Sequence, residues 1–165
     1  MGSITTPTDR APAADKIGGT RCLLFAAGGR LFGCEIAVVR EIIPARRATR
    51  LPGSPDYVLG LINLRGTVVT VIDLVQRLGA GSADEREGSI ILVAYGSRAV
   101  GLAVDEVRDV QAMAAERIDA GAAQVTDGLP AAIVRGVART PDGLVTLLDV
   151  RAVLRQVMSS VEEEL

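Results

Sequence analysis

A segment of this chain occurs twice, and the repeat limits the folds that the chain can adopt. Residues 58–74 match residues 134–150 under one constant shift, and residues 33–42 match residues 101–110 under a slightly different one. The aligned pairs of the longer match include Gly60 with Gly136, Val69 with Val145, Thr70 with Thr146, Asp73 with Asp149 and Leu74 with Val150. The chain therefore reads as one β-rich unit used twice, with linkers of unequal length.

Short apolar runs separated by glycine-containing turns predict strands along most of the chain. The dipeptides Gly28-Gly29, Arg65-Gly66 and Gly96-Ser97 suit tight hairpin turns. The expected strands are residues 22–27, 30–36, 38–44, 57–64, 67–73, 89–95, 98–104, 107–113, 130–140 and 144–149. Residues 74–78 predict one helical turn, and apolar residues at helical spacing predict a C-terminal helix over residues 150–162.

The pattern predicts an all-β fold of two small barrels, because closing a sheet removes its exposed edges. We expect residues 1–20 to be a flexible tail, residues 21–80 to form the first subdomain and residues 89–149 the second, with a glycine-, alanine- and charge-rich linker over residues 79–88. Each repeat should then form its own barrel. Val68 and Val145 should point inward, at a cost of about 1 to 3 kcal/mol each on truncation to alanine.

Composition limits the partners and the location. Hydrophobic residues make up 48% of the chain and aromatic residues 2%, and the formal charge is 18 − 20 = −2. Neither a basic nor an extreme acidic field is present, so we expect protein partners, no nucleic acid and no membrane insertion. No apolar run reaches the roughly 18 residues that span a bilayer, and the first 20 residues do not resemble a signal peptide, so we expect a cytoplasmic protein. Cys22 and Cys34 should be reduced core residues.

Catalysis is not expected, because the chain lacks the usual chemical groups. It has no histidine, which removes the commonest general base and the commonest metal ligand. Cys34 has no evident base to activate it, and neighbouring carboxylates such as Asp105 and Glu106 fall where solvated surface is the simpler explanation. No glycine-rich phosphate-binding loop with a lysine occurs. We therefore expect no enzyme activity, no cofactor and no metal.

Arg46, Arg47 and Arg50 form the only basic cluster. A solvated loop explains them better than a nucleic-acid patch, because small barrels that bind single strands need aromatic stacking platforms. A nucleic-acid-binding small β-barrel protein nevertheless stays open as an alternative class.

Arg65 is singled out within residues 60–66. Leu61, Asn63 and Arg65 share one strand face, and the second copy has Pro141 in place of Arg65. A duplicated fold does not need an arginine here, so Arg65 is either a solvated turn residue or a functional one.

The sequence words G-L-I-N-L-R-G-T-V-V-T-V-I-D-L, F-G-C-E-I-A-V-V-R-E-I-I and R-L-P-G-S-P-D-Y-V-L-G resemble the CheW family of bacterial chemotaxis coupling proteins. The resemblance covers about residues 21–158. It implies two side-by-side five-stranded barrels similar to SH3 barrels, and a non-enzymatic scaffold. The implied partners are the regulatory domain of a CheA-type histidine kinase and the cytoplasmic tip of a chemoreceptor, so the protein would be recruited to receptor arrays at the membrane.

The resemblance also implies the site. The receptor-binding groove would comprise Ile36, Glu41, Ile42, Gly60, Arg65, Gly101 and Val110. Glu41 and Arg65 match an acid and an arginine of the family that pair beside the receptor, whereas the kinase-docking face is left open. A coupling protein of a pilus or other non-flagellar chemosensory system is the alternative within the family. Leu59, the basic loop around Arg46 and the N-terminal tail depart from the family pattern and leave the receptor class open.

Overall fold

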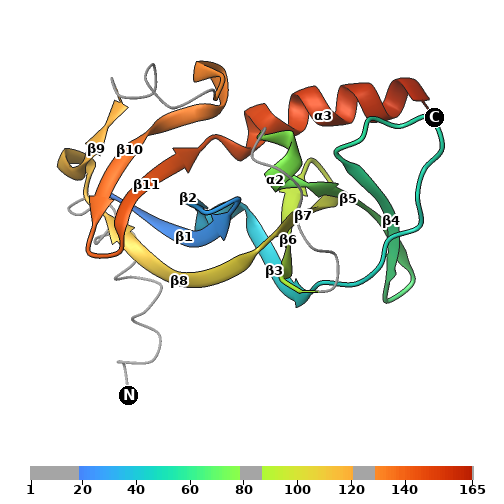
Figure 1. The fold of residues 1–165 in the computed structure, drawn as a ribbon, viewed down its shortest axis with the longest axis horizontal. Coiled ribbons are helices and arrows are strands. Elements are labelled where there is room, and N and C mark those ends of the chain that lie inside the picture. The colour runs from blue at the N-terminus through green and yellow to red at the C-terminus, as the bar shows by residue number, and fades with distance from the viewer. Residues whose placement is uncertain (1–18, 79–86, 121–128, 165) are drawn as a thin grey trace.

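The computed structural model describes residues 19–78, 87–120 and 129–164, the last six of these as backbone only. The flexible tail expected over residues 1–20 and the linker expected over residues 79–88 therefore lie largely outside the described residues. Within the described part, the protein is mostly β-structure in two sheets with one long C-terminal helix, as the sequence predicts (Figure 1).

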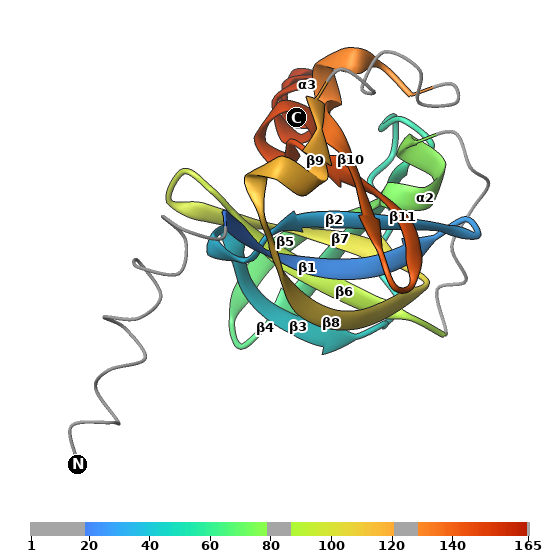
Figure 2. The same ribbon diagram turned by 90° about the vertical axis from the view of Figure 1, so that its left-hand side faces the viewer.

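Sheet A has six strands in the order β8-β1-β2-β11-β10-β9. Its strands are β1 (Thr20–Ala27), β2 (Arg30–Glu35), β8 (Glu106–Met113), β9 (Ile118–Asp119), β10 (Val134–Thr140) and β11 (Gly143–Leu148). Figure 2 looks at the molecule from this side and shows β8, β1 and β2 in sequence across the sheet.

Sheet B has five strands in the order β3-β6-β7-β5-β4. Its strands are β3 (Val39–Pro44), β4 (Val58–Leu64), β5 (Thr67–Asp73), β6 (Ser89–Tyr95) and β7 (Arg98–Val104). The loop after β3 joins the two edges of this sheet, because Thr49 and Leu61 exchange two backbone hydrogen bonds of 2.8 Å.

The predicted hairpins form where the sequence places them. Gly28 and Gly29 have φ angles of 62° and 80°, and Gly96 has a φ angle of 61°, values that residues with a Cβ rarely adopt. These turns pair β1 with β2 and β6 with β7 in antiparallel ladders. Each hairpin then joins a strand of a second hairpin in parallel, β2 against β11 and β7 against β5.

The sheets do not follow the predicted subdomains 21–80 and 89–149, and the expectation that each repeat forms its own barrel is wrong. Sheet A combines β1 and β2 from before the linker with strands from after it, and sheet B combines β3, β4 and β5 with β6 and β7. The two repeats have exchanged their first hairpins: β1–β2 of the first repeat lies in the sheet of the second, and β6–β7 of the second lies in the sheet of the first.

The exchange follows from the links that leave these two hairpins. After β2, the 3-10 helix η1 (Ile36–Val38) carries the chain from sheet A into sheet B. After β7, Asp105 is held at the β1–β2 turn, where its backbone N–H donates to the Ala26 carbonyl at 3.0 Å and its carboxylate accepts from the Gly28 N–H at 2.7 Å. Neither link turns the chain back to pair with the hairpin it has just left. The strand after each link therefore pairs with the hairpin of the other repeat, β3 with β6 and β8 with β1.

Three hydrophobic clusters stabilise this arrangement. The inner core of sheet A includes Cys22, Leu24 and Val145, and the inner core of sheet B includes Val69 and Leu92. The largest cluster, named here the shared core, lies between the sheets; it contains Leu23, Phe25, Cys34, Val58, Ile72, Ile91, Val93, Leu102, Val153 and Leu154 among others. Because successive side chains of a strand point to opposite faces, strands such as β1 contribute to two cores at once.

The prediction that Val68 points inward is also wrong, because 63% of this residue is exposed. Val145 is fully buried, as predicted. The repeat shows which of the two adjacent valines is the buried one. The shift that aligns the two hairpins places Val69, not Val68, on Val145, and Val69 is 3% exposed. Val68 corresponds to Leu144, which is 59% exposed.

Two helices follow the equivalent strands β5 and β11. The short helix α2 (Leu74–Arg77) begins where Asp73 accepts a hydrogen bond from the Gln76 N–H at 3.1 Å. The long helix α3 (Val150–Glu164) begins where Asp149 accepts one from the Ala152 N–H, also at 3.1 Å. Figure 1 shows α3 running along the top of the molecule. In the described residues, neither helix has the length and apolar character needed to cross a bilayer.

Candidate functional site

Glu41 on β3 and Arg65 in the β4–β5 turn form a two-pronged ion pair. Arg65 Nη1 donates to Glu41 Oε2 at 3.2 Å, and Arg65 Nη2 donates to Glu41 Oε1 at 2.5 Å. The arginine side chain is 68% exposed and the glutamate side chain 37% exposed. Such a fork fixes the orientation of both groups and leaves guanidinium N–H groups facing solvent.

The local backbone is unusual for an arginine. Arg65 and Gly66 have φ angles of 53° and 88° and form the two-residue turn between β4 and β5. The Asn63 side-chain oxygen supports this turn by accepting from the Gly66 N–H at 2.9 Å. Turns with two positive φ angles favour asparagine or glycine at the first position. The turn therefore does not account for the choice of arginine.

The pair also perturbs the ionisation of both groups in the direction that keeps it charged. The hydrogen bonds from Arg65 are the main cause that holds the pKa of the Glu41 carboxyl below its ordinary value, and the positive charge of Arg65 adds to them. The same contacts raise the pKa of the Arg65 guanidinium. The site therefore presents one carboxylate and one guanidinium over the physiological pH range.

Gly60 and Gly101 lie in one row across sheet B, in which Glu41 pairs with Leu92, Leu92 with Gly101, Gly101 with Val71 and Val71 with Gly60. A Cβ on Gly101 would lie 2.8 Å from a methyl carbon of Ile90, and a Cβ on Gly60 would lie 2.0 Å from the Thr49 carbonyl oxygen. Both glycines are buried. In the structure they allow these neighbours to pack closely against the sheet that carries Glu41.

The remaining predicted groove residues lie on three separate elements. Ile36 is in η1 and packs, partly buried, against the shared core. Ile42 on β3 is 41% exposed, and Val110 on β8 is 37% exposed. Within the predicted set, Glu41 and Arg65 are the two residues whose side chains form hydrogen bonds with each other. The exposed Ile42 and Val110 are aligned with each other by the repeat.

Two exposed apolar residues were not predicted as functional. Val68 on β5 and Leu144 on β11 are 63% and 59% exposed, and they occupy equivalent positions of the two hairpins. The signal that could have found them is the repeat itself, because an outward-facing apolar residue at the same place in both copies is not needed by either inner core.

Two arginines of the basic loop after β3 form hydrogen bonds with the backbone of β4. Arg46 Nη1 donates to the Asn63 carbonyl at 3.1 Å, Arg50 Nη1 donates to the Val58 carbonyl at 3.4 Å, and Arg50 also lies 3.5 Å from the Asp56 carboxylate. These contacts hold the loop after β3 against β4. They give two of the three arginines a structural role and weaken the case for a nucleic-acid patch.

Both cysteines are free and buried, as the sequence predicts. Burial is the main cause that raises the pKa of the Cys22 thiol to about 11 and that of the Cys34 thiol to about 12. Neither thiol is therefore ionised to a useful extent at neutral pH. Among the described residues, no three His, Cys, Asp or Glu side chains gather where they could hold a metal ion.

Comparison with known proteins gives the chain a family. The CheW-like domain model matches residues 21–158, the range that the sequence words indicate. A probable chemotaxis protein CheW of Rhizobium etli is 35% identical over 143 residues, which cover 86% of this chain and 92% of that protein. PilI of Pseudomonas aeruginosa is 34% identical over 88 residues, which cover 53% of this chain and 49% of PilI.

A solved structure shares the fold as well. The crystal structure of the scaffolding protein TtCheW from Thermoanaerobacter tengcongensis superposes with a TM-score of 0.73 at 28% sequence identity, covering 82% of this chain and 92% of TtCheW. The sequence match spans both β-sheets and the first part of the long terminal helix. The chain belongs to the CheW-like domain family.

Proposed function

We propose that this protein is a chemotaxis scaffold that couples chemoreceptors to a CheA-type histidine kinase and acts by binding without catalysis. The observation that carries the proposal is the family match over residues 21–158, which spans both sheets and the start of α3. The Glu41–Arg65 pair supports it, because an exposed, oriented ion pair on a turn that does not need an arginine suits recognition.

The receptor contact would use the surface around Glu41 and Arg65. A receptor tip is a helical hairpin, and an amphipathic helix binds through side chains spaced along one of its faces. Ile42 and Val110 supply exposed apolar surface, and Arg65 supplies hydrogen-bond donors that Glu41 does not use. Gly60 and Gly101 would act indirectly, by shaping the sheet that carries Glu41.

The kinase contact would use the apolar end of the β4–β5 hairpin. Val68 lies there with 63% of its surface exposed, on the strand next to the turn that carries Arg65. An aspartate at this position should weaken kinase binding about tenfold or more, because an apolar residue at the centre of a contact can supply that much affinity. Leu144→Asp is the matched control, since it makes the same kind of change at the equivalent position of the other hairpin.

A binding assay with separated partners tests these assignments. The purified protein should co-sediment with receptor-containing membranes and should bind the kinase regulatory domain in solution. Val68→Asp should lose kinase binding and keep receptor binding, whereas Leu144→Asp should keep both. If every variant that weakens one partner weakens the other equally, the two contacts are not separate and the proposal of two docking surfaces fails.

A coupling role in a pilus or other non-flagellar chemosensory system is a second candidate, for which the similarity to about half of PilI is weak support. Comparing the protein's binding to a flagellar and to a pilus-type kinase and receptor would decide between the two outputs. A nucleic-acid role would instead require polyanion binding that weakens steeply with salt. The use of Arg46 and Arg50 within the fold argues against it.

A further inference from the structure

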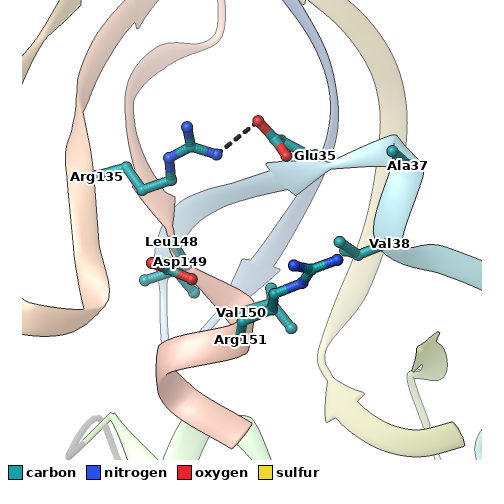
Figure 3. Close-up of a pocket in the computed structure, with 8 residues that line it drawn as sticks. All are labelled: Glu35, Ala37, Val38, Arg135, Leu148, Asp149, Val150 and Arg151. Carbon is teal, nitrogen blue, oxygen red and sulfur yellow. Dashed lines mark hydrogen bonds and ion pairs between the residues drawn. The ribbon is translucent and has the colours of Figure 1, made fainter. Parts of the chain in front are cut away.

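A cavity of about 390 Å³ lies where the end of β2, the start of β10 and the start of α3 meet. Figure 3 shows Arg135 reaching from β10 toward Glu35, while Arg151 extends from the first turn of α3 toward Val38. A second cavity of about 630 Å³ shares Asp149 and Arg151 with the first. The two cavities together form what is named here the α3 furrow.

The second cavity adds Arg155 and Tyr95 to the α3 furrow. Three arginines therefore line it, Arg135, Arg151 and Arg155. Volumes of this size are typical of sites for small molecules. None of these arginines belongs to the surface proposed for the receptor or the kinase.

Of the three arginines that line the furrow, one forms an ion pair within the described part of the chain and two do not. Arg135 is paired with Glu35, at a distance of 2.5 Å between Nη1 and Oε2. Asp149 uses its carboxylate to cap α3 by accepting from the Ala152 N–H. Among the described residues, no ion-pair partner is found for Arg151 or Arg155, and both are exposed. Two arginines that line the furrow are therefore left without an ion-pair partner in the part of the chain that the structure describes.

The position of these two arginines is unfavourable for the helix itself. They are four residues apart on α3, where like charges repel, and Arg151 lies in the first turn, where the helix macrodipole favours anions. The first turn itself contains no acidic residue, and the Asp149 carboxylate just before it is engaged in capping the helix. Helix stability therefore does not account for the pair, whereas a bound anion would relieve both repulsions.

We propose that the α3 furrow binds a small ligand that carries two or more negative charges on phosphate or carboxylate oxygens, held chiefly by Arg151 and Arg155. The forked guanidinium group matches both kinds of oxyanion. Tyr95 lines the second cavity and would offer apolar surface to the rest of the ligand.

Titration of the full-length protein with inorganic pyrophosphate, and separately with citrate, tests the site. We expect saturable binding in isothermal titration calorimetry at physiological salt, with amide shifts in NMR spectra confined to residues around the start of α3. Tighter binding of pyrophosphate would assign the site to phosphates, and tighter binding of citrate would assign it to carboxylates. If neither anion binds with a dissociation constant below about 10 mM, the proposal is overturned.

Variants separate a specific site from general attraction to charge. Arg151→Gln should weaken binding about tenfold or more, the effect expected for losing one charge-assisted contact. Arg139→Gln removes the same charge from the far end of β10 and should bind like the unmodified protein. Equal losses in the two variants would show only non-specific attraction and would overturn the proposal.

The thermal midpoint provides a second readout. Because Arg151 is unfavourable for the helix, Arg151→Gln should keep or raise the midpoint of the ligand-free protein while losing the stabilisation that the anion gives. A lower midpoint without ligand would mean that Arg151 has a structural role instead, which contradicts the proposal.

Discussion

Arg65 combines a backbone conformation that suits asparagine or glycine with a side chain that pairs with a distant glutamate. Its φ angle of 53° lies in a region that arginine rarely occupies. Its guanidinium reaches Glu41, which is 24 positions earlier in the chain. Exposed ion pairs add little to stability. The residue is therefore explained better by what it presents to a partner than by what it adds to the fold.

A charge reversal tests this explanation. Arg65→Glu should leave the thermal midpoint nearly unchanged but abolish receptor-dependent kinase activation, because two carboxylates would then face each other. Glu41→Arg should do the same, and the double exchange should recover part of the activity. Kinase activation in reconstituted arrays is the measurement, with a melting curve for each variant.

Arg65→Asn is the matched control for the backbone. Asparagine tolerates the positive φ angle, so this variant should keep the turn and still lose activation. A folded Arg65→Glu protein that activates the kinase normally would remove the pair from the receptor site.

The pH dependence of the pair has a definite direction. The pKa of the Glu41 carboxyl in the folded protein is lowered from its ordinary value of 4.5, mainly by hydrogen bonds from Arg65. Stability from the pair is therefore present above that value and is lost as the pH falls through the lowered pKa. In an NMR titration of the Glu41 carboxyl carbon, Arg65→Gln should move the midpoint back up toward 4.5. Arg139→Gln should leave it in place; a midpoint that ignores Arg65 would contradict the hydrogen bonds.

At the scale of the strand, the alternation of β5 gives a matched comparison. Val69 points into the inner core of sheet B and is 3% exposed, whereas its neighbour Val68 is 63% exposed. Val69→Ala should reduce the free energy of unfolding by about 1 to 3 kcal/mol, and Val145→Ala, its equivalent in sheet A, by a similar amount. Val68→Ala should be close to neutral. Chemical denaturation measures all three; a large loss at Val68 would mean that this face is buried.

The elements follow from the sequence, but their pairing does not. Two-residue turns such as Gly28-Gly29 are local signals, so the hairpins could be predicted from the chain alone. The exchange of hairpins depends on η1 and on the contacts of Asp105 with the β1–β2 turn, which are tertiary. A repeat shows which strands are equivalent and does not show which copy supplies the partner of each strand.

For the candidate site, the sequence indicates single residues better than their surroundings. The matching sequence words point to Glu41 and Arg65, and the structure brings these two side chains together. Val68 and its neighbour Val69 are equally apolar, so local composition does not show which of them is buried, whereas the alignment of Val69 with Val145 does. Arg151 gave no sequence signal, because its surroundings come from β2 and β10, which are distant in the chain.

For the whole molecule, the shared core makes the stability of each sheet depend on the other. It receives side chains from β1 and β2 of sheet A, from strands β4 to β7 of sheet B and from α3. Because the chain crosses between the sheets at η1 and again at Asp105, neither sheet can lose its structure without exposing this core. The two sheets should therefore unfold as one cooperative unit.

Denaturation followed by two probes tests this cooperativity. Far-ultraviolet circular dichroism reports on both sheets, and the fluorescence of Tyr57 and Tyr95, the two tyrosines of the chain, reports on residues packed against the shared core. The two transitions should coincide, as they do for a two-state protein. Val145→Ala in sheet A and Val69→Ala in sheet B should each shift both curves together, because damage to either inner core is transmitted through the shared one. A variant that separates the curves would show that the sheets are independent, and the exchanged hairpins would then not bind them into one folding unit.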